Sequence, residues 1–69
     1  MKIKNFKIGD KVYLEDEKVY GSIVEVINSE KKMKEWNLNE KGLMISSKDF
    51  GLVFYPIEFI NKVKELKNN

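Results

Sequence analysis

The stretch GDKVYLEDEKVYGSIVEVI, residues 9–27, decides the fold because it describes two strands joined by a polar reversal. In its first run, KVYLE, the apolar residues Val12 and Leu14 alternate with outward-facing neighbours, which is the period of a half-buried strand. The acidic run EDEK at 15–18 predicts the turn, and the β-branched run at 19–27 predicts the returning strand. We therefore expect an antiparallel strand pair that forms one wall of a small β fold.

The returning strand departs from simple alternation, because Ile23, Val24, Val26 and Ile27 fall on both of its faces. This pattern predicts a β-bulge, or a strongly bent strand that is covered on both sides. Gly21, inside the same run, fits either a bulge or the close approach of another backbone.

A polar segment and a second strand pair follow. Residues 29–41 interrupt the β pattern, so we expect a long variable loop with one or two helical turns, capped by Asn28 or Ser29. The runs LMISS at 43–47 and LVFY at 52–55 are separated by the turn sequence KDFG, which predicts a hairpin.

The C-terminal run that begins at Pro56 has two interpretations. Proline lacks an amide hydrogen and so ends the fourth strand. A helix starting there would place four apolar side chains on one face, namely those of Phe59, Ile60, Val63 and Leu66. A single 3₁₀ turn, PIEF, would instead lead into a short last strand around residues 62–66.

The order of these motifs looks like that of small SH3-like barrels of the KOW and Tudor type, over roughly residues 8–66. In those barrels a Gly-Asp pair opens the first strand, a glycine precedes an Ile/Val-rich second strand, and a Pro-containing 3₁₀ turn joins the fourth strand to the fifth. The resemblance implies a mainly β protein, a small antiparallel SH3-like barrel of about five strands with a 3₁₀ turn or short C-terminal helix. The first loop, EDEK, is acidic where KOW-like proteins commonly carry Gly and Lys/Arg, which argues against RNA binding by that loop.

Length and composition predict one small cytoplasmic domain. A chain of 69 residues has room for one core, so we expect a single β-barrel domain over 1–69, with an N-terminal arm at 1–8. There is no cysteine, and no apolar run is long enough for a signal peptide or a membrane span, so we expect a reducing, cytoplasmic setting. The Lys-, Asn- and Ile-rich usage suggests a bacterial or phage protein.

Catalysis and cofactor binding are not expected. The chain lacks histidine and cysteine, and so lacks the commonest general base, the thiol nucleophile and the usual transition-metal ligands. Ser46 and Lys48 are the one pair that resembles a nucleophile beside an amine base, and solvent-facing strand residues are the simpler interpretation. The acidic residues around 15–17 do not have the spacing of a calcium loop, and the glycines do not form a phosphate-binding pattern. We predict a protein that is not an enzyme and has neither a cofactor nor a metal.

Aromatic residues give the main functional indication. Barrels of this type often gather aromatics at one end of the sheet to hold a peptide or a base, and by this resemblance the candidates are Tyr13, Tyr20 and Tyr55. Met33 and Trp36 in the long loop are the second candidate contact. The alternatives are that the tyrosine rings cap the core and that Trp36 packs inward. We predict a non-enzymatic binding module for a protein partner.

The alternative function is the binding of RNA or single-stranded nucleic acid. The three tyrosines would serve as stacking platforms, with Lys11, Lys18 and Lys48 nearby. The net charge of only +2 and the absence of arginine favour the protein partner. The oligomeric state is left open.

Overall fold

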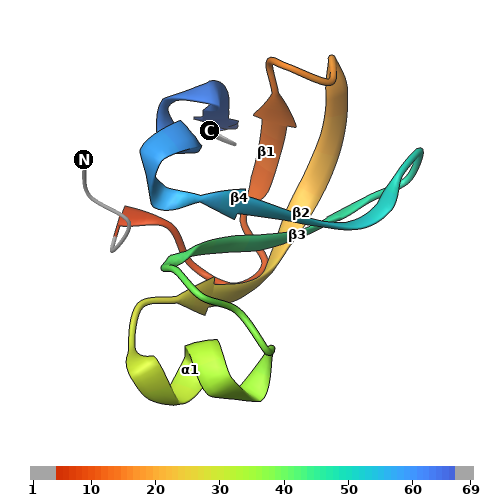
Figure 1. Ribbon diagram of the computed structural model, residues 1–69. Coiled ribbons are helices and arrows are strands. Elements are labelled where there is room, and N and C mark those ends of the chain that lie inside the picture. The colour runs from red at the N-terminus through yellow and green to blue at the C-terminus, as the bar shows by residue number, and fades with distance from the viewer. Residues whose placement is uncertain (1–4, 67–69) are drawn as a thin grey trace.

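Five antiparallel strands form one sheet in the order β4-β3-β2-β1-β5. The computed structural model describes residues 5–66, and Figure 1 shows how its elements are arranged. The elements are β1 (Lys11–Leu14), β2 (Val19–Ile27), α1 (Glu30–Glu35), β3 (Gly42–Ser47), β4 (Gly51–Pro56), the 3₁₀ helix η2 (Ile57–Lys62) and β5 (Val63–Glu65). The expectation of a mainly β fold of about five antiparallel strands is confirmed.

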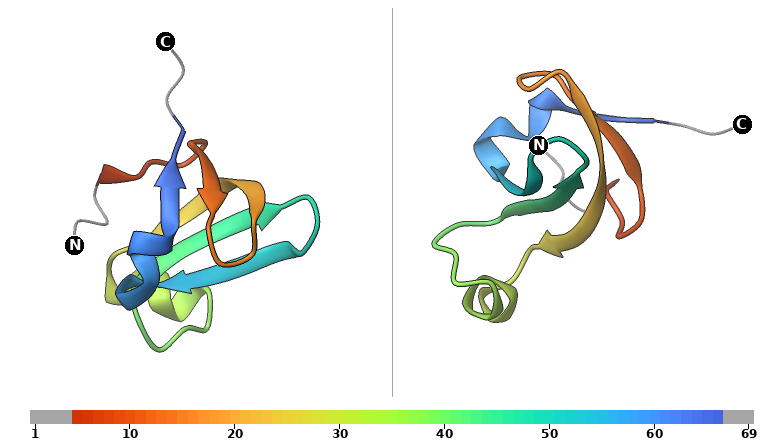
Figure 2. Two further views of the ribbon diagram at one scale, coloured as in Figure 1. Left: turned by 90° about the horizontal axis from the view of Figure 1, so that it is seen from above. Right: turned by 90° about the vertical axis from the view of Figure 1, so that its right-hand side faces the viewer.

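The sheet curls but is not closed by hydrogen bonds. Within the described residues, β4 and β5 form its two edges and do not pair with each other. Figure 2 shows β5 beside β1, with η2 leading into it from the end of β4. This strand order is consistent with an SH3-like barrel type of fold.

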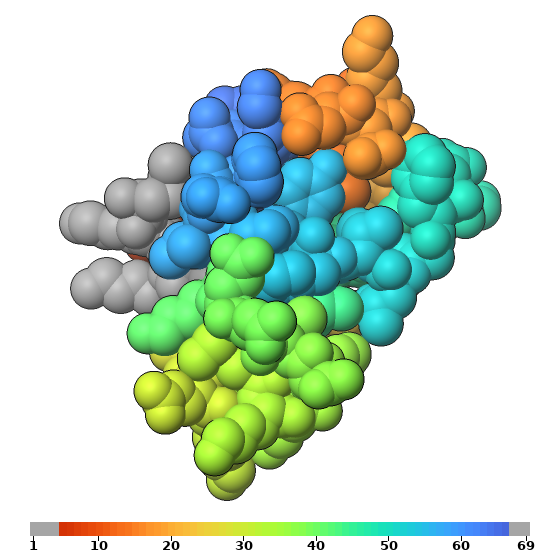
Figure 3. Space-filling view, viewed as in Figure 1, coloured from red at the N-terminus to blue at the C-terminus, as the bar shows by residue number. Residues whose placement is uncertain are grey.

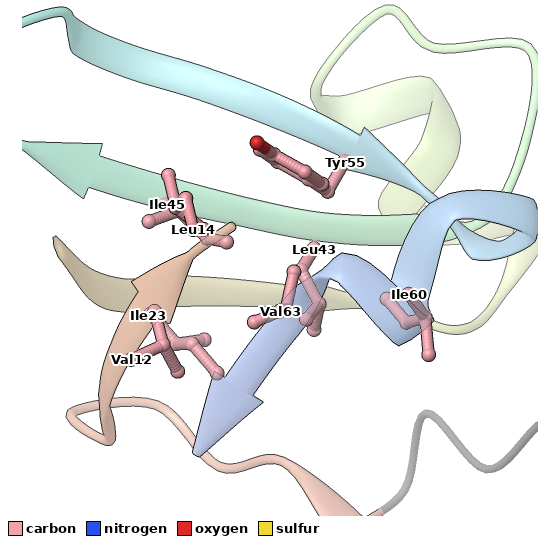
Figure 4. Close-up of a cluster of buried hydrophobic side chains, with 8 residues drawn as sticks. All are labelled: Val12, Leu14, Ile23, Leu43, Ile45, Tyr55, Ile60 and Val63. Carbon is pink, nitrogen blue, oxygen red and sulfur yellow. The ribbon is translucent and has the colours of Figure 1, made fainter. Parts of the chain in front are cut away.

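The core lies inside the curl and receives side chains from all five strands and from η2. Alternation along β1 sends Val12 and Leu14 inward, and both are completely buried. Figure 4 shows the eight clustered residues: Val12, Leu14, Ile23, Leu43, Ile45, Tyr55, Ile60 and Val63. Burial of these side chains is the main favourable term for a domain of this size.

A bulge in β2 explains the irregular apolar pattern of that strand. The register against β3 shifts between Ile23 and Glu25, so the residues after the shift change faces. Ile27 consequently points away from the main core, to the face that also carries Met44 of β3, and both residues are buried. Figure 1 places α1 and its connections at this end of the sheet. Of the two alternatives expected for this strand, the bulge is therefore confirmed.

Two glycines allow close contacts between neighbouring strands. A Cβ on Gly21 would lie 2.7 Å from Cγ2 of Ile45 and 2.9 Å from the Ser46 carbonyl oxygen. A Cβ on Gly42 would overlap the carbonyl oxygen of Tyr55. Gly21 therefore serves a close approach, while the bulge lies three residues further along β2.

The segment after Pro56 is a 3₁₀ helix followed by a strand, so the continuous helix is wrong. Val63 pairs with Leu14, and this pairing satisfies backbone groups on the outer edge of β1. Ile60 and Val63 enter the core, whereas Phe59 and Leu66 are exposed. Four apolar side chains therefore do not share one buried face.

The loop between β2 and β3 contains α1, as expected, and its cap is Ser29 and not Asn28. The Lys32 amide donates to the Ser29 hydroxyl at 3.2 Å. The helix ends at Glu35 with Trp36 as its C-cap, and the next residue, Asn37, has a φ of 58°. The Leu38 amide donates to the Met33 carbonyl at 2.7 Å. This is the hydrogen-bonding pattern of a Schellman C-cap. In the part of the chain that is described, no helix is long and apolar enough to cross a membrane.

Candidate functional site

Tyr13 and Tyr20 form a ring pair on the outer face of the first hairpin. The register places them directly opposite each other on β1 and β2, and their ring centroids are 4.9 Å apart at an angle of 55°. Tyr13 is half-buried, and Tyr20 is 64% exposed. Cross-strand aromatic pairs stabilise a hairpin, and the free face of Tyr20 is available to a ligand.

Tyr55 does not join this pair, because it lies on the inner side of the sheet, and its role as a partner contact stays a prediction. Its side chain is only 7% exposed and belongs to the core cluster. The physical reason is strand alternation: Tyr55 is paired with the buried Leu43 on β3 and points to the same inner side. The ring caps the core, which was the alternative interpretation.

Met33 and Trp36 are both half-buried, so neither projects freely from the loop. Lys32 holds α1 to the sheet through an ion pair with Glu25 of β2, at 3.3 Å. These placements favour the interpretation that the loop packs its apolar residues inward. Their role as a partner contact stays a prediction.

A hollow, which we call the β4 hollow, lies between the first turn, β4 and η2. Its volume is about 340 Å³, and Figure 3 shows a depression between the β1–β2 turn and the β4 and η2 segments. Phe59 is 47% exposed at its border. The hollow is lined by Asp16, Glu17, Val53, Phe54, Tyr55, Pro56 and Phe59. It therefore combines an apolar surface with two carboxylates.

One polar group at the β4 hollow, the hydroxyl of Tyr55, has no hydrogen-bond partner among the described residues. The hydroxyl of Tyr55 is buried, and no described residue forms a hydrogen bond with it. Burial, followed by the negative charges of Glu17 and Asp16, raises the pKa of this phenol above its ordinary value of 10.0. Asp16 also forms an ion pair with Lys62 at 3.8 Å, between two exposed side chains. The hollow thus has a negative potential and a neutral hydroxyl.

A second hollow, which we call the lysine hollow, lies on the outer face of the sheet. Its volume is about 330 Å³. The register places Lys11 opposite Ser22, and Ser22 opposite Ser46, which forms a polar row across three strands. The hollow is lined by Lys11, Tyr20, Gly21, Ser22, Ser46 and Lys48. The lining contains Lys11, Tyr20 and Lys48, which are three of the residues predicted for nucleic-acid binding. Lys18 is not part of it.

Ser46 and Lys48, the pair that resembles a nucleophile beside an amine base, lie on the same surface. Ser46 and Lys48 both line the lysine hollow, but both are exposed on an open surface. Among residues 5–66, no group of three or more His, Cys, Asp or Glu side chains is placed to hold a metal ion.

Comparison with known proteins gives no relative for this chain. No protein-family model matches it, and neither a curated protein nor a solved structure is significantly similar to it. The two hollows are therefore the features of this protein that indicate a function.

Sequence reasoning missed the β4 hollow, although its components were visible. The pattern predicted a turn at Asp16 and Glu17, and it predicted at Pro56 the end of a strand and the start of a helix or 3₁₀ turn. Phe54 and Phe59 follow each other closely in a run with the turn-forming Pro56 between them. The acidic turn and this aromatic segment are nearly forty residues apart in the sequence, and only the curl of the sheet joins them.

Proposed function

We propose that this protein is a non-enzymatic binding module that holds a segment of a partner protein in the β4 hollow. The observation that carries the proposal is the composition of that hollow, with aromatic and proline surface beside the carboxylates of Asp16 and Glu17. Ligand sites in proteins are typically concave and mostly apolar, with a few polar groups that set specificity. The carboxylates disfavour phosphate groups and favour a cationic protein segment.

The finer assignments belong to the same proposal. The motif order resembles that of KOW and Tudor barrels, and the observed strand order is consistent with the broader SH3-like barrel type of fold. This resemblance supports recognition of a peptide at one end of such a sheet. The composition of the chain supports a setting in the cytoplasm of a bacterium or in a phage-infected cell. The fold by itself does not carry a function, so the proposal depends on the hollow.

The test is selection of binders from a displayed library of random linear peptides, followed by mapping with amide NMR. Enriched peptides are expected to shift the amide signals of Asp16, Glu17, Phe54 and Phe59. Glu17→Lys should weaken their binding about tenfold, because a charge-assisted contact is worth roughly 1.4 kcal/mol or more. Glu40→Lys is the matched control, since Glu40 is an exposed loop residue outside the hollow. Failure to enrich any peptide, or shifts confined to another surface, would contradict the proposal.

The second candidate function is the binding of single-stranded nucleic acid in the lysine hollow. The specific observation in its favour is that Lys11, Lys48 and the exposed ring of Tyr20 line one surface. Lysines attract the phosphate backbone, and an exposed ring is a stacking platform for a base. An oligonucleotide should then be retained at low salt and released steeply between about 50 and 200 mM salt. Absence of retention at low salt would exclude this function.

A further inference from the structure

The free edge of β4 lies beside the β4 hollow. Among the described residues, β4 pairs with β3 alone. The Ile57 amide donates to the Lys41 carbonyl at 2.8 Å, and in an antiparallel ladder the bonded pairs alternate along the strand. Counting back from Ile57 in steps of two, the backbone groups of Tyr55 and Val53 form hydrogen bonds with β3. The backbone groups of Leu52 and Phe54 therefore face away from the sheet.

Of the features that usually protect an edge strand, the β4 edge has only a proline at its last position. Proteins block edges with charged side chains, prolines, bulges or very short strands. The other edge, β5, has only three residues and carries the exposed Lys64 and Glu65. In contrast, β4 has six residues, none of them charged, and Leu52 is 54% exposed. Pro56 interrupts it only at its last position. The β4 edge is thus the one suited to pair with another strand.

The Tyr55 hydroxyl is an independent sign of a polar ligand group at this place. The residue is more than nine-tenths buried and lines the hollow, and no described residue satisfies its oxygen. Figure 4 shows this oxygen pointing away from Ile60, toward the end of the core occupied by Leu14, the last residue of β1. The acidic turn follows directly after Leu14. A buried hydroxyl without a partner is costly, and an incoming donor would remove that cost.

Lysine and arginine are the side chains that fit these surroundings. Their cationic ends donate hydrogen bonds to carboxylates and to a phenolic oxygen, and their alkyl stems pack on apolar surface. Phe54, Pro56 and Phe59 supply that apolar surface. The ion pair between Lys62 and Asp16 is exposed at both ends, so a ligand cation replaces it at little cost.

Resting on the proposed function, we propose that the partner segment binds as an extra strand along the β4 edge. A lysine or arginine side chain of that strand enters the β4 hollow, between the carboxylates of Asp16 and Glu17 and the hydroxyl of Tyr55. Backbone pairing with Leu52 and Phe54 supplies affinity, and the hollow supplies the preference for a basic residue. The charge of the hollow favours such a peptide over the β4 edge of a second copy, which carries no charged residue.

The experiment is an amide NMR titration with a capped peptide Thr-Val-Lys-Val-Thr, up to about 10 mM, which saturates a site with a Kd near 1 mM. Two matched peptides accompany it. One has norleucine in place of lysine, and the other carries N-methyl groups on the backbone edge that would face β4. The lysine peptide is expected to shift the amides of Leu52, Phe54 and Glu17, and each matched peptide is expected to bind at least about tenfold more weakly.

Protein variants separate the roles of the groups. Tyr55→Phe and Glu17→Gln should each weaken the lysine peptide about three- to tenfold, with a smaller effect on the norleucine peptide. Glu40→Gln should leave all three affinities unchanged. The thermal unfolding of each variant is recorded first, and Glu17→Gln, at an exposed turn position, keeps the test decisive if Tyr55→Phe does not fold.

Several results would overturn the inference. Three of them concern the peptides: no shifts with the lysine peptide, equal binding of the norleucine peptide, or equal binding of the N-methylated peptide. The fourth is a set of concentration-dependent shifts along β4 in the protein alone, which would show that a second copy occupies the edge. The proposed function fails separately. If library peptides without a basic residue bind the β4 hollow, the proposed binding function stands, but the proposal of a lysine or arginine in the hollow is wrong.

Discussion

Tyr55 shows how one residue joins stability to a site. Its ring completes the core, while its hydroxyl lacks a partner among the described residues and faces a negative potential. A core position of this volume filled by phenylalanine would avoid the unsatisfied group. We therefore expect Tyr55→Phe to leave the free energy of unfolding at neutral pH unchanged or slightly higher, as measured by chemical denaturation.

The pH dependence of stability tests the environment of the same residue. The pKa of Tyr55 in the folded protein is raised above its ordinary value of 10.0. Between pH 10.0 and the folded pKa, the phenol is therefore protonated in the folded state and ionised in the unfolded state. The stabilisation is complete below pH 10.0 and is lost as pH rises from there through the folded pKa. The free energy of unfolding of the native chain should thus fall more steeply above pH 10 than that of Tyr55→Phe. Parallel curves would contradict the assigned burial.

A substitution at Gly42 should lower the free energy of unfolding, in contrast to Tyr55→Phe. A Cβ there would overlap the carbonyl oxygen of Tyr55 and lie 2.8 Å from the ring of Phe54. Gly42→Ala should lower the free energy of unfolding by about 2 kcal/mol or more, because the backbone of two paired strands must separate. Gly51→Ala is the control: its Cβ meets open space, and only its φ of 73° opposes the substitution, at a cost of about 1 kcal/mol. Equal losses would refute the steric argument.

At the scale of elements, α1 depends on its caps more than on burial, since none of its residues is fully buried. Ser29 accepts a hydrogen bond from the Lys32 amide, whereas Asn28 is exposed and lies outside the cap. Ser29→Ala should lower the free energy of unfolding by about 1 kcal/mol, and Asn28→Ala by much less. Denaturant unfolding of both variants measures the difference. A larger loss for Asn28→Ala would show that the helix begins earlier.

At the scale of the whole molecule, the two hollows are expected to act independently. They share no lining residue, because one faces the outer side of β1, β2 and β3 and the other follows the edge of β4. The double variant Lys11→Glu, Lys48→Glu should abolish any oligonucleotide retention at low salt while leaving the lysine peptide within about twofold of its native affinity. Loss of both activities would indicate a single shared surface.

Local pattern was sufficient for most elements of this fold. Alternation in KVYLE, the broken alternation around Val24, the turn KDFG and the strand-ending Pro56 each predicted an element that the structure contains. The two C-terminal interpretations could not be separated in this way, because helical and 3₁₀ spacing are similar over so short a run. The pairing of residues 63–65 with the free edge of β1 favours a strand over a continuous helix in this segment.

The sequence by itself determined the first four strands, their turns and inward-facing residues such as Val12 and Leu14, because side-chain periodicity and turn chemistry act between near neighbours. It also indicated that Lys11, Lys48 and Tyr20 are surface residues. Only the tertiary structure decided that Tyr55 is buried and that the acidic turn meets Phe54, Pro56 and Phe59. The curl of a five-stranded sheet brings these distant segments together, and that curl results from the packing of the whole core.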